Sequence, residues 1–123
     1  MKRLLASLAL VIVATFGLAA CSAPAASPAA MTADTVVVDV RTAGEYAQGH
    51  LKGAVNIDVE SADFDNQVKQ LPTDGTYLVY CYSGNRAASA VSRMAAMGFS
   101  DLTNAGGIAD ASESTGLDIV TTP

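Results

Sequence analysis

The chain has 123 residues, half of them apolar, and carries a formal net charge of −5 at pH 7. A chain of this length forms one domain, and its apolar content supports a hydrophobic core without disulfides. The acidic balance argues against nucleic acid as a partner and against docking on anionic lipid headgroups through basic patches.

The amino-terminal stretch has the layout of a secretory signal. Lys2 and Arg3 provide a basic start, and residues 4–20 form an apolar run that is short for a bilayer span. The run ends in Leu-Ala-Ala-Cys at residues 18–21, which resembles the lipobox of bacterial lipoproteins, where the precursor is cut before the cysteine and the sulfur is acylated. The alternatives are an ordinary signal peptide cut after an Ala-x-Ala site and an uncleaved anchor.

The lipobox interpretation divides the chain into three parts. Residues 1–20 are a lipoprotein signal peptide, residues 21–33 an Ala/Ser/Pro-rich tether that begins at the lipid-bearing Cys21, and residues 34–123 the folded domain. Removing two of the seven basic residues leaves five against 12 acidic ones, a net charge of −7. The mature protein is therefore expected on the extracytoplasmic side, held at the membrane by its lipid alone. An acylated Cys21 leaves Cys81 unpaired, and such a thiol is a liability outside the cytoplasm unless it is buried or used.

Strands and helices alternate along the domain. Residues 35–40 are β-branched without polar alternation, which is typical of a strand buried on both faces of a parallel sheet. Thr42 and Glu45 predict a capping box, and Ser61 predicts a second helix start. The expected strands are 35–40, 54–57, 76–80 and 99–102, and the expected helices are 42–48, 61–71, 86–97 and 108–113. This alternation predicts an α/β domain with a mainly parallel sheet.

The loop after the strand 76–80 carries the candidate chemistry, with the sequence Cys81-Tyr82-Ser83-Gly84-Asn85-Arg86. Ligands gather at the carboxyl ends of parallel strands, and a loop that enters a helix can turn its backbone N–H groups inward. Gly84 permits the positive φ that such a curl needs. A sulfur inside the curl is stabilised as a thiolate, which makes Cys81 a candidate nucleophile. The alternative is a half-buried cysteine that closes a core strand and is followed by an ordinary turn.

Two long motifs at the correct spacing resemble those of single-domain rhodaneses, a family of sulfurtransferases, over residues 36–120. The matching segments are Val38-Asp39-Val40-Arg41-Thr42, Glu45-Tyr46, Gly49-His50-Leu51-Lys52-Gly53-Ala54-Val55-Asn56-Ile57, Tyr80-Cys81-Tyr82-Ser83-Gly84-Asn85-Arg86-Ala87, Gly98-Phe99 and Gly106-Gly107-Ile108. The resemblance implies a rhodanese-like domain with helices on both faces of a mainly parallel sheet. It also implies that Cys81 takes a sulfane sulfur from a thiosulfate-like or polysulfide donor, holds it as a persulfide, and passes it to a thiophilic acceptor.

The same resemblance assigns roles to the loop. The backbone amides of Tyr82, Ser83, Gly84, Asn85 and Arg86 would bind the anionic sulfur or the donor's oxygens, and neither a cofactor nor a metal is expected. Arg86 either pairs with the anion or hydrogen-bonds loop carbonyls.

Supporting positions are expected around the loop. Asp39, at the end of the first strand, is expected to orient a neighbouring loop, whereas Arg41 either adds positive potential or pairs with Glu45. His50, the only histidine, is expected to brace the turn before Gly53 rather than to transfer protons.

Three functions stay open on the sequence. The leading one is a sulfurtransferase that acts on a small sulfur-containing anion or thiol, with a protein acceptor as a further partner. The second is a persulfide-carrying or thiol-binding module without efficient turnover. The third is a phosphatase or arsenate-handling enzyme, which is disfavoured because four residues separate Cys81 from Arg86, one fewer than in related phosphatases. Many relatives have a tryptophan where this chain has Ala111, and its loss is expected to loosen the last helix.

Overall fold

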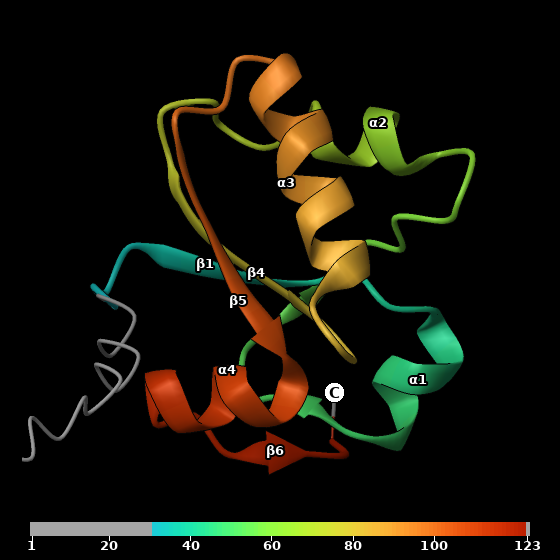
Figure 1. Ribbon diagram of the computed structural model, residues 1–123, viewed down its shortest axis with the longest axis vertical. Helices are drawn as coiled ribbons and strands as arrows, with labels where there is room; N and C mark the ends of the chain where they lie inside the picture. The colour runs from blue at the N-terminus through green and yellow to red at the C-terminus, as the bar shows by residue number, and fades with distance from the viewer. Residues whose placement is uncertain (1–30, 123) are drawn as a thin grey trace, which may run out of the picture.

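The computed structural model describes residues 31–122. The predicted signal peptide, the lipid attachment at Cys21 and most of the tether lie outside these residues. The elements, in chain order, are β1 Thr35–Asp39, α1 Ala43–Gln48, β2 His50–Leu51, β3 Val55–Asn56, α2 Phe64–Val68, β4 Thr76–Cys81, α3 Asn85–Ala96, β5 Asp101–Gly107, α4 Ile108–Thr115 and β6 Ile119–Val120 (Figure 1). Within 31–122, no helix combines the length and apolar character needed to cross a membrane.

The central sheet has four strands in the order β3-β1-β4-β5, and every neighbouring pair is parallel. The predicted mainly parallel sheet is therefore confirmed. Strand β1 pairs with β4 along its full length, from Thr35 opposite Thr76 to Asp39 opposite Tyr80. A second, two-stranded sheet joins β2 to β6 in antiparallel fashion. This register places the carboxyl ends of β1 and β4, and hence Asp39 and Cys81, at the same edge.

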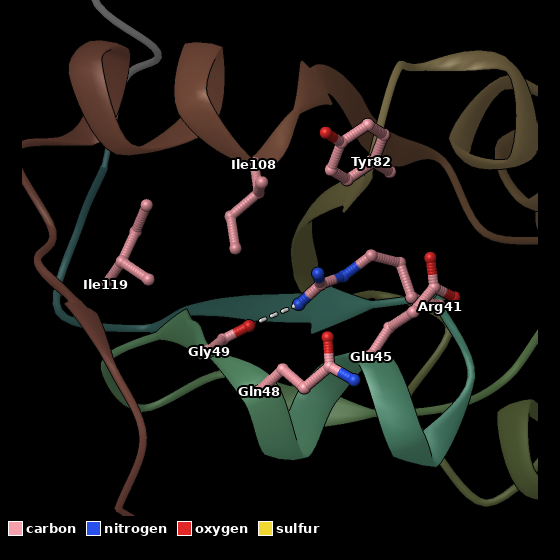
Figure 2. A pocket seen from close by; sticks show the side chains of 7 residues that line it. All are labelled: Arg41, Glu45, Gln48, Gly49, Tyr82, Ile108 and Ile119. Atoms are coloured by element: carbon pink, nitrogen blue, oxygen red, sulfur yellow. Dashed lines mark hydrogen bonds between the residues drawn. The ribbon is translucent and has the colours of Figure 1, made fainter.

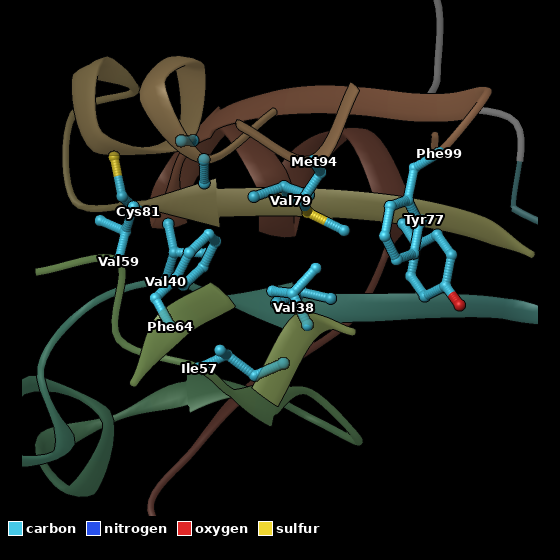
Figure 3. Packing of buried hydrophobic residues seen from close by; sticks show 13 residues of the cluster. Val38, Val40, Ile57, Val59, Phe64, Tyr77, Val79, Cys81, Met94 and Phe99 are labelled. Atoms are coloured by element: carbon cyan, nitrogen blue, oxygen red, sulfur yellow. The ribbon is translucent and has the colours of Figure 1, made fainter. Parts of the chain in front are cut away.

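Helices cover both faces of the central sheet, as predicted: α2 and α3 lie together on one side, and α1 and α4 on the other (Figure 1). Alternate residues of β4 face opposite sides because successive side chains of a strand point in opposite directions. The core between the sheet and α2/α3 consists of Val38, Val40, Ile57, Val59, Phe64, Val68, Tyr77, Val79, Cys81, Ala87, Ala90, Met94 and Phe99 (Figure 3). The core on the α1/α4 side consists of Val37, Leu51, Ala54, Leu78, Tyr80 and Ala111.

Helix α1 forms where the sequence predicts it, with the full capping box. The backbone N–H of Glu45 donates to Thr42 Oγ1 (3.3 Å), and the N–H of Thr42 donates back to Glu45 Oε2 (3.1 Å). The chain leaves the helix at Gly49, as expected. The capping box fixes Glu45 at the start of a helix that faces the loop after Cys81.

Helix 61–71 was predicted wrongly, since α2 spans only Phe64–Val68. The hydroxyl of Ser61 accepts a hydrogen bond from the N–H of Asp63 (3.1 Å), so it closes a short turn instead of capping the helix. Asp63 is the residue before α2, and its side chain makes no capping hydrogen bond. Phe64 and Val68, one turn apart, are the buried residues of this short helix.

The last part of the chain also differs from the prediction. Strand β5 begins at Asp101 and not at residue 99. Phe99 is buried and packs edge-on against Tyr77, with ring centroids 5.4 Å apart, which holds it out of the strand. Helix α4 runs two residues beyond the predicted 108–113, and Ala111 is fully buried in the core beneath it. The two-residue strands β2 and β6 were not predicted.

The two predicted helix starts give a matched pair of substitutions. Thr42→Ala should lower the free energy of unfolding by about 1 kcal/mol, because it removes a side-chain cap. Ser61→Ala should change it by less than about 0.5 kcal/mol, because the site is a partly exposed turn that caps no helix. Urea unfolding of both variants measures the difference, and a loss below about 0.5 kcal/mol in Thr42→Ala would contradict a stabilising role of the capping box.

Candidate functional site

The candidate loop lies at the carboxyl end of β4, with β1 on one side of that strand and β5 on the other. Strand β4 ends at Cys81, and α3 begins at Asn85, so only residues 82–84 form the turn. Gly84 has φ +96°, a left-handed conformation that a side chain would strain. The predicted role of Gly84 in turning the chain into the helix is therefore confirmed by its backbone.

Cys81 is a free cysteine with no exposed surface. Its sulfur points toward the loop that leads into α3 (Figure 3), and the backbone N–H of Gly84 donates to Sγ at 2.9 Å. Within residues 31–122, this is the one hydrogen bond that Sγ accepts. The other loop amides were expected to donate to the sulfur as well, but none of them does. The geometry thus supplies one main-chain donor to Sγ at the start of a helix, where the dipole favours negative charge.

The paired glycines of β5 lie against the loop. A Cβ on Gly107 would collide with the carbonyl oxygen of Tyr82, and one on Gly84 would come within 3.4 Å of the Cα of Gly106. The two backbones are therefore in direct contact, and the loop keeps its shape because β5 has no side chains there. Sequence reasoning matched Gly106 and Gly107 to a family segment and gave them no role, although two adjacent glycines are a signal of close backbone approach.

Arg86 is held by Glu45 in a two-pronged ion pair. The Nη1–Oε2 and Nη2–Oε1 distances are both 2.8 Å, and Glu60 approaches Nη1 at 3.5 Å. Of the two roles expected of Arg86, hydrogen bonding to loop carbonyls is not seen within residues 31–122, where its guanidinium pairs with Glu45 of α1. The Arg86 guanidinium, aided by hydrogen bonds from Thr42, lowers the pKa of Glu45 to about 2, so that this carboxylate is ionised at neutral pH.

Asp39 and Arg41 form a second ion pair, which is buried. The carboxylate of Asp39 accepts from Arg41 Nε (3.0 Å) and Nη2 (2.7 Å), and also from the Tyr80 hydroxyl (2.7 Å). Arg41 Nη2 donates further to the carbonyl oxygen of Gly49 at 2.6 Å. Of the two roles left open for Arg41, pairing with Glu45 is therefore not seen within residues 31–122. Asp39 has the predicted structural role, since it orients the segment that follows β1.

The remaining predicted residues fall around this framework. His50 is buried, its Nδ1 lies 2.9 Å from the carbonyl oxygen of Tyr46, and its ring stacks on that of Tyr46 at 3.7 Å. It thus braces the end of α1 and not the turn before Gly53. The side chains of Ser83 and Asn85 are exposed, and Tyr82, 69% exposed, projects from the loop.

A cavity of about 340 Å³ opens beside the loop. Figure 2 shows the residues that line it, which come from the segment 41–49 that contains α1, the loop, α4 and β6: Arg41, Glu45, Gln48, Gly49, Tyr82, Ile108 and Ile119. Cys81 is not part of the lining, but Tyr82 is the next residue along the chain. The sulfur itself is buried in the core on the α2/α3 side of the sheet.

The low pKa of Glu45 predicts a pH-dependent contribution to stability. A carboxyl group whose pKa is depressed in the folded protein stabilises it above the unfolded pKa of about 4.5, and that contribution is lost as the pH falls toward 2. Glu45→Gln should therefore cost about 1 kcal/mol at pH 7, a value limited by solvent screening of this partly exposed pair. Urea unfolding should show the difference from wild type shrinking between pH 5 and pH 2.

Glu60→Gln is the matched control, because Glu60 touches the same guanidinium at longer distance from an exposed position. It should have little effect at any pH. Equal losses in the two variants, or a loss in Glu45→Gln that does not vary with pH, would contradict the assignment.

Comparison with known proteins agrees with this geometry. The thiosulfate sulfurtransferase GlpE of Pseudomonas fluorescens is 41% identical over 68 residues, which cover 54% of this chain and 60% of that protein. The thiosulfate sulfurtransferase PspE of Escherichia coli is 32% identical over 73 residues, covering 59% of this chain and 70% of that protein. The chain thus spans about 60% of the length of the first curated relatives that it matches.

Solved structures show the same fold. A rhodanese from Escherichia coli, solved with anions, has a TM-score of 0.59 and 28% identity, covering 72% of this chain and 99% of that one. A rhodanese-related protein from Thermoplasma volcanium has a TM-score of 0.58 and 29% identity, covering 72% and 86% of the two chains. Residues 24–113 match the family model of the rhodanese-like domain. With most of its length matched in this way, the chain belongs to the rhodanese-like family.

Proposed function

We propose that this chain is a sulfurtransferase in which Cys81 carries a sulfane sulfur as a persulfide. The observation that carries the proposal is the position of Cys81 Sγ, at the end of a parallel strand with the N–H of Gly84 donating to it at 2.9 Å. The similarity to two proteins named thiosulfate sulfurtransferase supports the same chemistry.

The reaction is a double displacement. In the first half, the Cys81 thiolate attacks the sulfane sulfur of a donor such as thiosulfate; a Cys81–S–S⁻ persulfide forms, and the S–S bond of the donor breaks to release sulfite with the bonding electrons. In the second half, an acceptor such as cyanide attacks the outer sulfur. The bond between the two sulfurs breaks, the pair returns to Cys81 as the thiolate, and thiocyanate leaves.

The loop provides the electrostatic support for both anionic states. Gly84 donates to Sγ, and the amino-terminal end of α3 adds its dipole. Arg86 and Arg41 pair with Glu45 and Asp39 and donate no hydrogen bond to Sγ, although the positive charge of Arg86 interacts with Cys81. Main-chain N–H groups are suited to an outer sulfur that arrives and leaves, since they need no rearrangement during the reaction.

The second candidate function, a persulfide carrier without efficient turnover, is favoured by one observation. Cys81 has no exposed surface, so a donor or acceptor reaches the sulfur only when the loop moves. A carrier loads its sulfur once and delivers it to a partner, whereas an enzyme must open on every cycle. Turnover with cyanide therefore separates the two functions.

The proposal extends to location: the protein acts outside the cytoplasm, attached to a membrane through a lipid on Cys21. The support is the order of a basic start, an apolar run and Leu-Ala-Ala-Cys at residues 18–21. A thiol that operates there must be kept from pairing. Burial of Cys81 behind its loop provides that protection.

Thiosulfate treatment of the full chain, followed by intact mass measurement, tests the chemistry. Wild type should gain one sulfur atom, Cys81→Ser should gain none, and Cys21→Ser, the matched control at the other cysteine, should gain one as wild type does. Cyanide should then remove the sulfur and yield thiocyanate over many cycles if the protein is an enzyme.

The outcomes are distinct. An adduct with a single round of thiocyanate formation would support the carrier. The absence of an adduct with thiosulfate, polysulfide and mercaptopyruvate alike would overturn the proposed chemistry. In detergent phase separation of cell extracts, wild type should enter the detergent phase and Cys21→Ser should not, and equal partitioning would contradict lipid attachment.

A further inference from the structure

The first turn of α3 is held by an ion pair and not by a capping side chain. The residue before the helix is Gly84, which has no side chain to cap the free N–H groups at this end. Arg86 instead ties the turn to α1 through its two 2.8 Å contacts with Glu45. Figure 1 shows the start of α3 facing α1. The end of the loop after Cys81 therefore depends on a contact between two partly exposed side chains.

This contact lies close to the sulfur. Cys81 and Val59 are neighbours in the core on the α2/α3 side (Figure 3), and Glu60, the residue after Val59, approaches the guanidinium of Arg86 at 3.5 Å. The pKa of Arg86 is raised mainly by its hydrogen bonds to Glu45, and the charge of Cys81 adds to the rise. Arg86 thus joins three segments that surround the sulfur: α3, α1 and the segment that contains Glu60.

The closed arrangement leaves Cys81 without exposed surface, and its surroundings differ in how easily they can move. Strand β4 pairs with a parallel strand on each side, which fixes the backbone of Cys81. The turn that follows packs against the backbone of Gly107. The first turn of α3, held by the Arg86 pair, can move without breaking the hydrogen bonds of the sheet. Opening of the site therefore begins most easily with this pair.

We propose that Glu45 is a positioning residue for the sulfur chemistry: by holding Arg86, it keeps the first turn of α3 closed over Cys81 and limits how often a reagent reaches Sγ. The inference rests on the proposed function and deepens it. Thiols attack the S–S bond of a persulfide as they attack that of a disulfide. A site that opens only part of the time therefore keeps its sulfur longer, and the strength of the pair sets the open fraction.

Alkylation of Cys81 by iodoacetamide, an uncharged reagent, measures this access. The parent is the full chain with Cys21→Ser, in which Cys81 is the only thiol. Rates are compared at about pH 10, above the ordinary thiol pKa of about 8.5, so that differences report access and not ionisation. Glu45→Gln should raise the rate about fivefold, because the amide can still accept the capping hydrogen bond from Thr42 but cannot form the charged pair.

Two matched variants separate this role from a general loss of stability. Thr42→Ala weakens the cap of α1 but leaves both partners of the Arg86 pair in place. Asp65→Asn breaks a similar ion pair of the same helix, the one between Asp65 and Arg93, two turns beyond Arg86. Both variants should be alkylated at the rate of the parent. Urea unfolding of each variant verifies that it is folded under the conditions of the assay.

Salt provides a second measurement that needs no comparison of stabilities. A higher salt concentration screens a partly exposed ion pair. It should therefore speed the alkylation of the parent and leave the rate of Glu45→Gln unchanged. After thiosulfate treatment, limiting cyanide should also remove the added sulfur about fivefold faster from Glu45→Gln than from the parent.

The outcomes distinguish this inference from the function on which it rests. Equal alkylation of Glu45→Gln and the parent, or an equal increase in Thr42→Ala or Asp65→Asn, would overturn the role of Glu45. The same conclusion follows if salt affects the parent and Glu45→Gln alike. If alkylation changes as expected but thiosulfate adds no sulfur to any variant, the sulfurtransferase proposal fails, while control of access to Cys81 by Glu45 remains.

Discussion

The ion pair between Arg86 and Glu45 connects the two halves of the site, and the geometry of the sulfur depends on it. Arg86 lies in the first turn of α3, and Glu45 is fixed at the start of α1 by its capping box with Thr42. The loop from Cys81 is therefore tied at both ends, by β4 before it and by this pair after it. In this fixed loop, the N–H of Gly84 donates to Sγ. The backbone of Gly107 packs against the carbonyl group of Tyr82.

A second ion pair, between Asp39 and Arg41, fixes the segment that follows β1. Asp39 fixes Arg41 in a buried arrangement to which Tyr80 adds its hydroxyl. Burial, with Asp39 as neighbour, raises the pKa of Tyr80, so the phenol stays protonated and remains a donor. Both arginines near the loop are thus paired with carboxylates, and within residues 31–122 the hydrogen bond to the sulfur comes from the main-chain N–H of Gly84.

Local signals in the sequence predict much of this arrangement. The capping box, the β-branched strand β1 and the strand β4 that ends at Cys81 each depend on residues close in the chain, and the structure has all three. Gly84 with its positive φ belongs to the same class. Such features can be predicted without knowing the tertiary fold, because the interactions that determine them lie within a few residues of the chain.

The incorrect predictions concern features that depend on contacts between segments distant in the sequence. Pairing with Glu45 was one of two roles left open for Arg41, but Glu45 pairs with Arg86, 41 positions away, once the sheet brings α1 and α3 together. Phe99 was predicted to be the first residue of a strand, but its ring packs edge-on against Tyr77 in the core. Strands β2 and β6 have two residues each and stabilise one another only after the chain has folded back. The cavity, assembled from four separate segments, has no local signal at all.

The central claim is that the loop after Cys81 holds an added sulfur among its backbone N–H groups. A crystal structure of the thiosulfate-treated protein tests it most directly. The account predicts electron density for one further sulfur on Cys81 Sγ, lying within hydrogen-bond distance of N–H groups of residues 82–86, while Arg86 remains paired with Glu45. An added sulfur that projects outside the loop, or a loop that unfolds to accept it, would contradict the account.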